Sequence, residues 1–149
     1  MAIDTDDAID KFGTQDAVTT TGASTADDAF TSAGSWTNDD DAPSASAVGT
    51  FTFATAATAG TVVNLYARLM NIQSTNDQEV PDANYQNTYM GSFPVNDGST
   101  SPQYIAIDIY LPNTMTSQVY DFYIENKAGQ TISANWSLHI TPKSIGPHA

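Results

Sequence analysis

The sequence predicts an all-β protein, an antiparallel β-sandwich or jelly-roll body that follows an extended acidic N-terminal arm. Three observations lead to this prediction. Residues 103–111 alternate between polar and apolar side chains, which is the pattern of a half-buried strand. Several other short stretches rich in β-branched and aromatic residues are separated by short connections. No stretch has the sustained periodicity of a long amphipathic helix.

The body is expected to contain at least six strands, over residues 48–54, 61–70, 87–95, 103–111, 119–124 and 130–140. Pro94 favours an edge position or a strand end for the third of these, and Pro112 ends the fourth, because proline cannot continue a central ladder. The last strand places its apolar side chains on one face: Ile132, Ala134, Trp136, Leu138 and Ile140.

Two connections between the later strands suggest hairpins. Asn126 and Gly129 stand at the first and fourth positions of a type I turn followed by a left-handed residue. A three-residue loop there would pair residues 119–124 with 130–140 and keep every apolar residue on one face. If residues 112–117 also join a hairpin, Asp108 lies opposite Asp121.

The N-terminal arm, residues 1–47, differs from the body in composition. The chain has 27 Leu, Ile, Val and Phe residues, of which the arm holds five, together with ten Asp and one Lys. Such a segment cannot bury enough apolar surface to offset its own ordering entropy. The sequence therefore predicts two parts, an arm over 1–47 that is ordered by contacts and a β-sandwich body over 48–149. Residues 4–12 could form one or two helical turns with Asp4 as the cap.

Composition and charge exclude several classes of function. The 149 residues include 17 acidic and 4 basic side chains, for a formal net charge of −13, which argues against binding nucleic acid. No apolar stretch of 18 residues is present, so no membrane span is expected, and the acidic N-terminus is the reverse of a signal peptide. The absence of cysteine excludes disulfides, thiolate chemistry and Cys-based zinc sites.

Isolated aromatic residues are the candidate interface residues. Phe12, Phe30 and Trp36 are spaced along the polar arm, and docking is the favoured interpretation for them, with the protein's own body, another copy or a partner as the surface. Tyr104 and Tyr110 lie opposite the isoleucine face of their strand. They belong either to the second face of a sandwich sheet beneath a loop or to an interface, where Tyr is enriched.

Catalytic interpretations of the sequence are weaker. His139 shares a polar strand face with serines, and a nucleophile system needs a base held by an orienting acid, so a Ser–His–Asp triad is rejected. Asp108 and Asp121, if they face each other, could act as the carboxylate pair of a glycoside hydrolase. A simpler explanation is that these two charges prevent the sheet from aggregating with other chains. The protein is expected not to be an enzyme and to need no cofactor.

The acidic run Asp39–Asp41, with Asn38, resembles a calcium-binding composition, but it lacks the alternating spacing of an EF-hand loop. Contiguous aspartates usually form a solvated, self-repelling segment. A calcium site at this run is left open, and no metal ligand is predicted.

Two segments resemble a known family. Residues 84–95, NYQNTYMGSFPV, are the first, and residues 120–134, YDFYIENKAGQTISA, continuing through Trp136, Leu138 and Pro142 to Lys143, are the second. Both resemble head decoration or cement proteins of long-tailed bacteriophages, the siphophages. The resemblance covers the last half of the chain and consists of turn and core residues, so it concerns the fold more than an activity.

The resemblance implies a virion protein made in the host cytoplasm and placed on the outer capsid surface. It implies a β-sandwich body that assembles as a homotrimer and cements neighbouring subunits of the major capsid protein, with no catalytic residues. Two alternatives stay open. One is a tail- or fibre-associated or carbohydrate-binding β-sandwich module, and the other, ranked last, is a hydrolase that uses Asp108 and Asp121.

Overall fold

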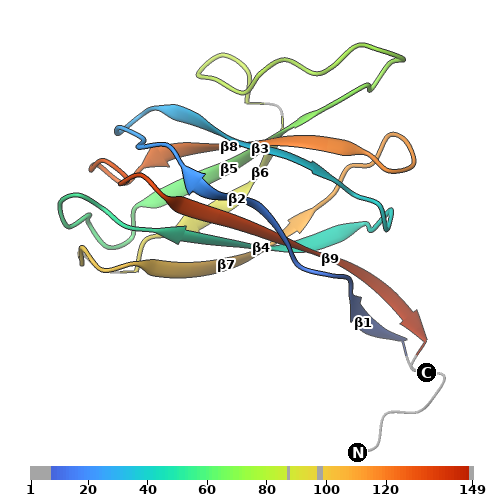
Figure 1. Ribbon diagram of the computed structural model, residues 1–149, viewed down its shortest axis with the longest axis horizontal. Coiled ribbons are helices and arrows are strands. Elements are labelled where there is room, and N and C mark those ends of the chain that lie inside the picture. The colour runs from blue at the N-terminus through green and yellow to red at the C-terminus, as the bar shows by residue number, and fades with distance from the viewer. Residues whose placement is uncertain (1–7, 87, 97–98, 148–149) are drawn as a thin grey trace, which may run out of the picture.

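The computed structural model describes residues 8–86, 88–96 and 99–147, which form two antiparallel sheets packed face to face (Figure 1). The predicted β-sandwich is therefore confirmed. The described residues contain nine strands: β1 (Ala8–Phe12), β2 (Asp16–Gly22), β3 (Phe30–Thr37), β4 (Ser44–Phe51), β5 (Val62–Leu69), β6 (Tyr89–Pro94), β7 (Gln103–Tyr110), β8 (Val119–Lys127) and β9 (Trp136–Pro147). Within these residues there is no helix of the length and apolarity needed to span a bilayer.

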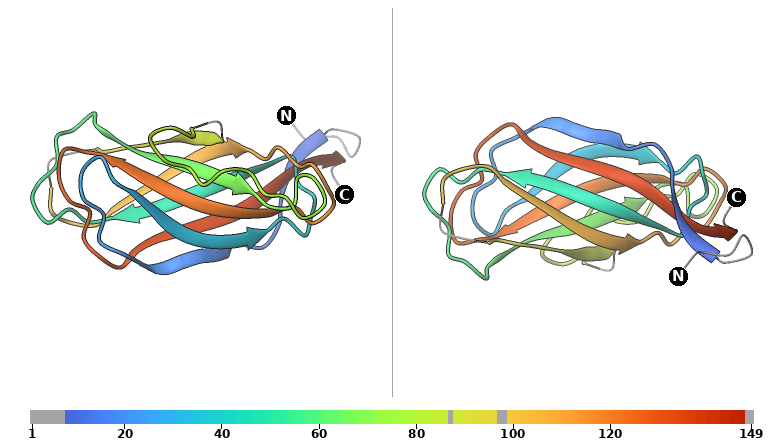
Figure 2. Two further views of the ribbon diagram at one scale, coloured as in Figure 1. Left: turned by 90° about the horizontal axis from the view of Figure 1, so that it is seen from above. Right: turned by 90° about the horizontal axis from the view of Figure 1, so that it is seen from below.

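The two sheets are named here sheet I and sheet II. Sheet I has the order β1-β9-β4-β7, and β2 pairs with the same edge of β9 as β1 does. Sheet II has the order β3-β8-β5-β6. Seen from above and below, the two layers lie on opposite sides of the molecule (Figure 2). The edge strands β6 and β7 lie on the same side of the sandwich and contact each other.

Alternation along each strand builds the core between the sheets. In β4 every second residue is buried, from Ala45 to Phe51, and the partly exposed residues between them face outward. The apolar faces predicted for residues 103–111 and 136–140 point inward as expected. The largest fully buried side chains come from both sheets: Trp136, Tyr120, Phe51, Phe53, Phe93, Phe122, Leu65, Leu111, Ile124, Ile132, Leu138 and Ile140. Each large apolar side chain buried in this way contributes about 1.5–3 kcal/mol.

The division between an arm and a body at residue 47 is wrong. That boundary falls inside β4, which lies between β7 and β9 in sheet I. β3 is an edge strand of sheet II, and Trp36 on it is buried in the common core. The arm lacks large aliphatic residues because its inward positions hold Ala33, Ala45 and Ala47, small side chains that belong to the same buried core as the large ones of later strands.

The helical turns expected over residues 4–12 are also wrong where they can be tested. Asp4 lies outside the described residues, and residues 8–12 form β1. β1 pairs with the end of β9, so its backbone hydrogen bonds go to another strand.

Neither of the two expected hairpins forms. β8 pairs with β3 and β5 in sheet II, whereas β9 belongs to sheet I, so the chain crosses between sheets after residue 127. Gly129 has the left-handed conformation expected of it, with φ of 73°. Asn135, with φ of 68°, then interrupts the expected strand over 130–140, and β9 begins only at Trp136. β7 and β8 likewise lie in different sheets.

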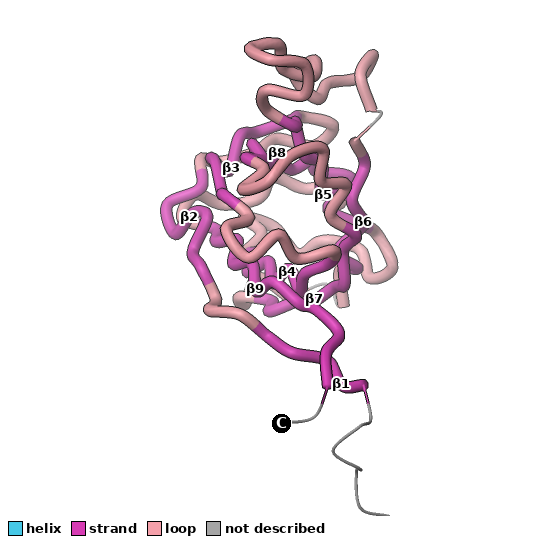
Figure 3. The backbone as a smooth tube through the Cα atoms, turned by 90° about the vertical axis from the view of Figure 1, so that its right-hand side faces the viewer, coloured by secondary structure: helices cyan, strands magenta, loops and turns pink. Residues whose placement is uncertain are grey.

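β9 extends beyond the sandwich. β4 pairs with it only as far as Lys143, and the remaining residues up to Pro147 pair with β1 alone. This two-stranded ribbon, residues 8–12 with 143–147, projects past sheet I (Figure 1). In the end-on view the long loop between β5 and β6 extends from the opposite side, above sheet II (Figure 3).

Candidate interaction surface

The outer face of sheet I carries four of the large apolar side chains that are exposed to solvent. The register pairs Tyr110 with Ser44, Ser44 with Lys143 and Lys143 with Phe12, so one row crosses β7, β4, β9 and β1. Because residues directly opposite in a sheet point to the same side, Tyr110 and Phe12 face outward together. With strands about 4.8 Å apart, their backbones are separated by roughly 14 Å across the row.

Tyr104 and Ile145 belong to the same face by strand alternation. Tyr104 lies six residues before Tyr110 on β7, and Ile145 lies two residues after Lys143 on β9. Their exposed fractions are 74% for both, against 71% for Tyr110 and 62% for Phe12. The central strand β4 places small, partly exposed side chains between them: Ser44, Ser46, Val48 and Thr50. We call this surface, with its two tyrosines, Phe12 and Ile145, the sheet I face.

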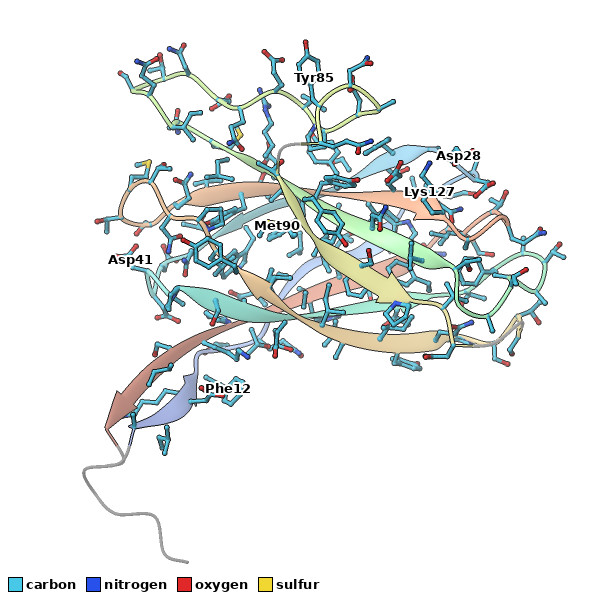
Figure 4. The ribbon with its side chains drawn as sticks, turned by 180° about the vertical axis from the view of Figure 1, so that it is seen from behind. Phe12, Asp28, Asp41, Tyr85, Met90 and Lys127 are labelled. Atoms are coloured by element: carbon cyan, nitrogen blue, oxygen red, sulfur yellow. The ribbon has the colours of Figure 1, made fainter. Side chains whose placement is uncertain are left out.

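The ribbon adds unpaired strand edges to the sheet I face. Beyond Lys143, β9 pairs with β1 on one side, and no pairing to it on the other side is found within the described residues. An isolated two-stranded ribbon is marginally stable in water, and free edges invite pairing with another chain. Phe12 lies on this ribbon, clear of the sandwich (Figure 4). The ribbon therefore has the exposure and the backbone groups that suit contact with a partner.

Basic residues are concentrated near the ribbon although the chain is strongly acidic. Lys11 and Lys143, two of the four basic residues, lie on β1 and β9 where these strands pair. The Lys143 ammonium lies 2.8 Å from the Asp108 carboxylate on the sheet I face. A cavity of about 280 Å³ at the base of the ribbon is lined by both lysines together with Asp40, Phe12 and Pro142, among others.

The structure separates the five candidate interface residues into two groups. Tyr104, Tyr110 and Phe12 share the outward side of sheet I, although nothing in the sequence pattern joins Phe12 to the tyrosines. Trp36 lies in the core and donates from Nε1 to Asp16 Oδ2 at 3.0 Å. Phe30 is half-buried and packs against Tyr66, with ring centroids 5.5 Å apart. Docking onto another molecule is therefore wrong for Trp36, whose ring the protein's own core surrounds.

Ile145 was not predicted from the sequence. The expected last strand ended at Ile140, and no residue beyond it was assigned to a strand. Continued alternation through Lys143 and Ile145 is the signal that could have identified it.

Asp108 and Asp121 do not form a pair. Asp108 lies on β7 in sheet I, and Asp121 lies on β8 in sheet II. Asp121 accepts a hydrogen bond from the Ser35 hydroxyl and lies 3.8 Å from the Arg68 guanidinium. Since each carboxylate has its own partners in a different sheet, the two cannot act on one glycosidic bond, and the hydrolase interpretation is wrong.

Sequence reasoning also missed a buried carboxylate on the outer side of sheet II. Glu125 is 3% exposed and accepts hydrogen bonds at Oε2 from Asn64 Nδ2 at 2.9 Å and from the Tyr66 hydroxyl at 3.1 Å. Its Oε1 lies 3.2 Å from the Lys127 ammonium. Burial and the neighbouring Glu125 charge raise the pKa of Tyr66 to about 12. Lys127 also contacts Asp28 at 2.7 Å, and these two side chains meet in Figure 4.

The remaining polar candidates either make hydrogen bonds within the fold or lie at the surface. Asp41 accepts a hydrogen bond from the Ser117 backbone at 2.6 Å, which fixes the acidic run against the loop after β7. Over residues 8–86, 88–96 and 99–147, no three His, Asp or Glu side chains cluster as metal ligands would. His139 is partly exposed beside Val48 on the outer side of sheet I.

Comparisons with known proteins give only a distant match. No protein-family model matches the sequence, and no curated protein matches it. Two structures of infectious bursal disease virus, of strains Gt and Gx, align with 89% of this chain at TM-scores of 0.40 and 0.39 and 16% sequence identity. This chain spans about a third of each of those chains, 33% and 32%. Scores of this size describe a distant likeness in the arrangement of strands.

Proposed function

We propose that the protein is a structural protein of a bacteriophage virion, which decorates the outer capsid surface as a trimer and cements neighbouring subunits of the major capsid protein. The observation that carries the proposal is the sheet I face. Three exposed aromatic rings and Ile145 face outward from one sheet, and two of these residues, Phe12 and Ile145, lie on the ribbon with unpaired edges. Exposed aromatic side chains on one sheet face suit a protein–protein interface, where a few aromatic anchors supply most of the binding energy.

The resemblance of residues 84–95 and 120–143 to siphophage decoration proteins supplies the identity of the partner. Contacts made by three copies at once would multiply modest affinities through a high effective concentration. Closed three-fold symmetry would follow from identical contacts between copies. The net charge of −13 would keep the decorated surface soluble and favour basic patches on the shell.

Binding to DNA-free, expanded capsids that lack this protein tests the proposal. The wild-type protein is expected to cosediment with the capsids and to raise their resistance to heat. Replacing Tyr104, Tyr110 and Phe12 together by serine should weaken binding by at least tenfold, since a central aromatic anchor is worth about 2 kcal/mol or more. Sedimentation velocity of the free protein measures whether it is a trimer.

Tyr85→Ser is the matched control. Tyr85 is also exposed, but it lies on the loop above sheet II, away from the ribbon (Figure 4). It should leave capsid binding unchanged. If the wild-type protein does not cosediment, or if the triple variant binds as well as the wild type, the assignment of this face to the capsid is overturned.

A further inference from the structure

The ribbon, residues 8–12 with 143–147, receives little support from the rest of the fold. Every residue of β1 is exposed except Ile9, which is half-buried, and Ile145 on the other strand is 74% exposed. Figures 1 and 3 both show β1 and the end of β9 leaving the body together. A ribbon of two strands buries too little surface to offset its own ordering entropy. A further strand beside it would supply the missing stabilisation.

The hydrogen-bond pattern of the ribbon identifies its free backbone groups. The Gly13 N–H donates to the Pro142 carbonyl at 2.9 Å, so these two residues form a hydrogen-bonded pair. Such pairs alternate with non-hydrogen-bonded pairs along an antiparallel ladder. The N–H and C=O of Asp10 and Phe12 therefore point away from β9, and those of Ile145 point away from β1. No strand within the described residues pairs with either of these two edges.

A second copy of this chain can pair with both edges, because each ribbon has one free edge on β1 and another on β9. When β1 of one copy lies beside the free edge of β9 in the next, the same contact repeats head to tail, and a closed ring leaves no edge open. Two-fold pairing of β1 with β1 would leave the β9 edges open. In the register that pairs all five residues, it would also place Asp10 opposite Asp10, and like charges directly opposite destabilise a sheet.

The charges beside the free edge of β9 favour the same occupant. β4 stops pairing with β9 at Lys143, and the acidic run Asp39–Asp41 comes just before β4. Asp40 lines a cavity together with Ser144, so the run lies close to the free part of β9. Among the described residues, neither Lys11 nor Asp40 has an ion pair within its own copy, whereas the other three basic residues do. A β1 strand added here brings the neighbouring copy's Lys11 to this acidic run.

We propose that the ribbon is the contact between copies: β1 of one copy pairs with residues 145–147 of the next, and three ribbons close into a ring. This inference rests on the trimer of the proposed function and deepens it by naming the contact that forms the trimer. Edge pairing uses backbone groups, so the side chains of Phe12 and Ile145 stay on the sheet I face and remain able to contact the shell.

Sedimentation velocity of full-length variants at 50 µM tests the contact, and the wild type is expected to be a trimer. Asp10→Pro removes an N–H that points out of the ribbon and places its ring where the neighbouring strand would lie, while the hydrogen bonds to β9 are kept. It should weaken association by tenfold or more. Asp10→Asn is the matched control, because it removes the same charge, keeps the N–H and should stay trimeric. Lys11→Glu should weaken association most strongly at low salt.

Engineered cysteines test the geometry without background, because the chain has no cysteine of its own. Phe12→Cys together with Ile145→Cys should give covalent trimers on mild oxidation, since one residue lies on each edge strand of the contact. Tyr104→Cys together with Ile145→Cys should give none, because Tyr104 lies on β7, away from the ribbon.

Three results would overturn the inference: a wild-type protein that is monomeric at 50 µM, an Asp10→Pro variant that associates as the wild type does, or cross-linking that stops at dimers. Capsid binding is measured separately. If Asp10→Pro stays trimeric while the wild type binds shells, only this contact is wrong. If the ribbons pair and the protein does not bind shells, the capsid role is wrong and the contact stands.

Discussion

Gly22 and Trp136 lie opposite each other in the β2–β9 pair, and the indole ring occupies the space that a side chain on residue 22 would need. The same indole donates from Nε1 to the Ala23 carbonyl at 2.7 Å. Trp136 is therefore held between the core and the backbone of β2. A glycine at this position allows the β2 backbone to approach a large buried ring closely.

Gly22→Ala should lower the free energy of unfolding by about 2–3 kcal/mol, since the new methyl group collides with a buried ring that cannot move aside. Urea denaturation followed by Trp fluorescence measures the change. Gly146→Ala is the control, because its methyl group would meet only the flexible Lys11 side chain. A Gly22→Ala protein as stable as the wild type would show that the ring is free to shift.

Removal of β1 and removal of residues 1–47 should have very different consequences. A protein that begins at residue 14 keeps both sheets and should unfold cooperatively, with a melting temperature within a few degrees of the wild type. A protein that begins at residue 48 loses β3 and half of β4, together with the buried Trp36. It should show no cooperative transition in circular dichroism, since a central strand cannot be lost without exposing the core. A folded 48–149 fragment would contradict the shared core.

The sequence predicted well which residues of a strand face the core, and it predicted poorly which strands pair with each other. Alternation identified the inward residues of β7, such as Ile105 and Ile109, because period two depends only on the strand itself. It could not distinguish a hairpin from a crossing between sheets after β8. Both arrangements bury the same residues, for example Ile124 and Leu138, and they differ only in the hydrogen-bond partner.

Similar reasons explain what was missed in the arm and in the candidate surface. Inward alanines such as Ala45 give no apolar signal, although they lie in the centre of the core. Tyr104, Tyr110 and Phe12 were identified individually as exposed aromatic residues, but their common face depends on pairings between strands far apart in the sequence. Glu125 was missed for the same reason, since Asn64 is 61 residues away from it.

Glu125→Gln should destabilise the protein by about 2–4 kcal/mol. The groups that contact the carboxylate, Asn64 Nδ2, the Tyr66 hydroxyl and Lys127 Nζ, all donate hydrogen bonds. A glutamine presents an amide nitrogen in place of one carboxylate oxygen, and neither Asn64 Nδ2 nor Lys127 Nζ can accept from it. The Tyr66 hydroxyl could accept only by giving up its own donation, so at least one hydrogen bond is lost at a buried site. Denaturant unfolding at pH 7 measures the effect.

Asp108→Asn is the matched control for this prediction. It also removes a carboxylate from an ion pair, but the Asp108 side chain is 75% exposed. Exposed ion pairs contribute about 0–1 kcal/mol, so the change should be small. If the two substitutions lowered the free energy of unfolding equally, burial of Glu125 would not increase the contribution of its hydrogen bonds to stability.

Stability should fall as the pH rises from about 10 to 12. The folded protein raises the pKa of Tyr66 to about 12, through burial and the Glu125 charge, whereas the usual value is 10.0. Burial also raises the pKa of Tyr120, and hydrogen bonds to Asp28 and Glu125 raise that of Lys127. Between the unfolded and folded pKa values, the folded state therefore binds more protons than the unfolded state. The free energy of unfolding then decreases with increasing pH, and the stability contributed by these groups is complete only below about pH 10.

Tyr66→Phe tests this dependence on pH. At pH 7 it should cost about 1 kcal/mol, because the hydrogen bond to Glu125 is lost. Between pH 10 and 12 its stability should fall less steeply than that of the wild type, since one of the groups with a raised pKa is gone. Urea titrations at half-unit steps of pH give both slopes. Parallel slopes for the two proteins would mean that Tyr66 keeps its ordinary pKa in the folded state and that the loss of stability at high pH comes from Tyr120 and Lys127 alone.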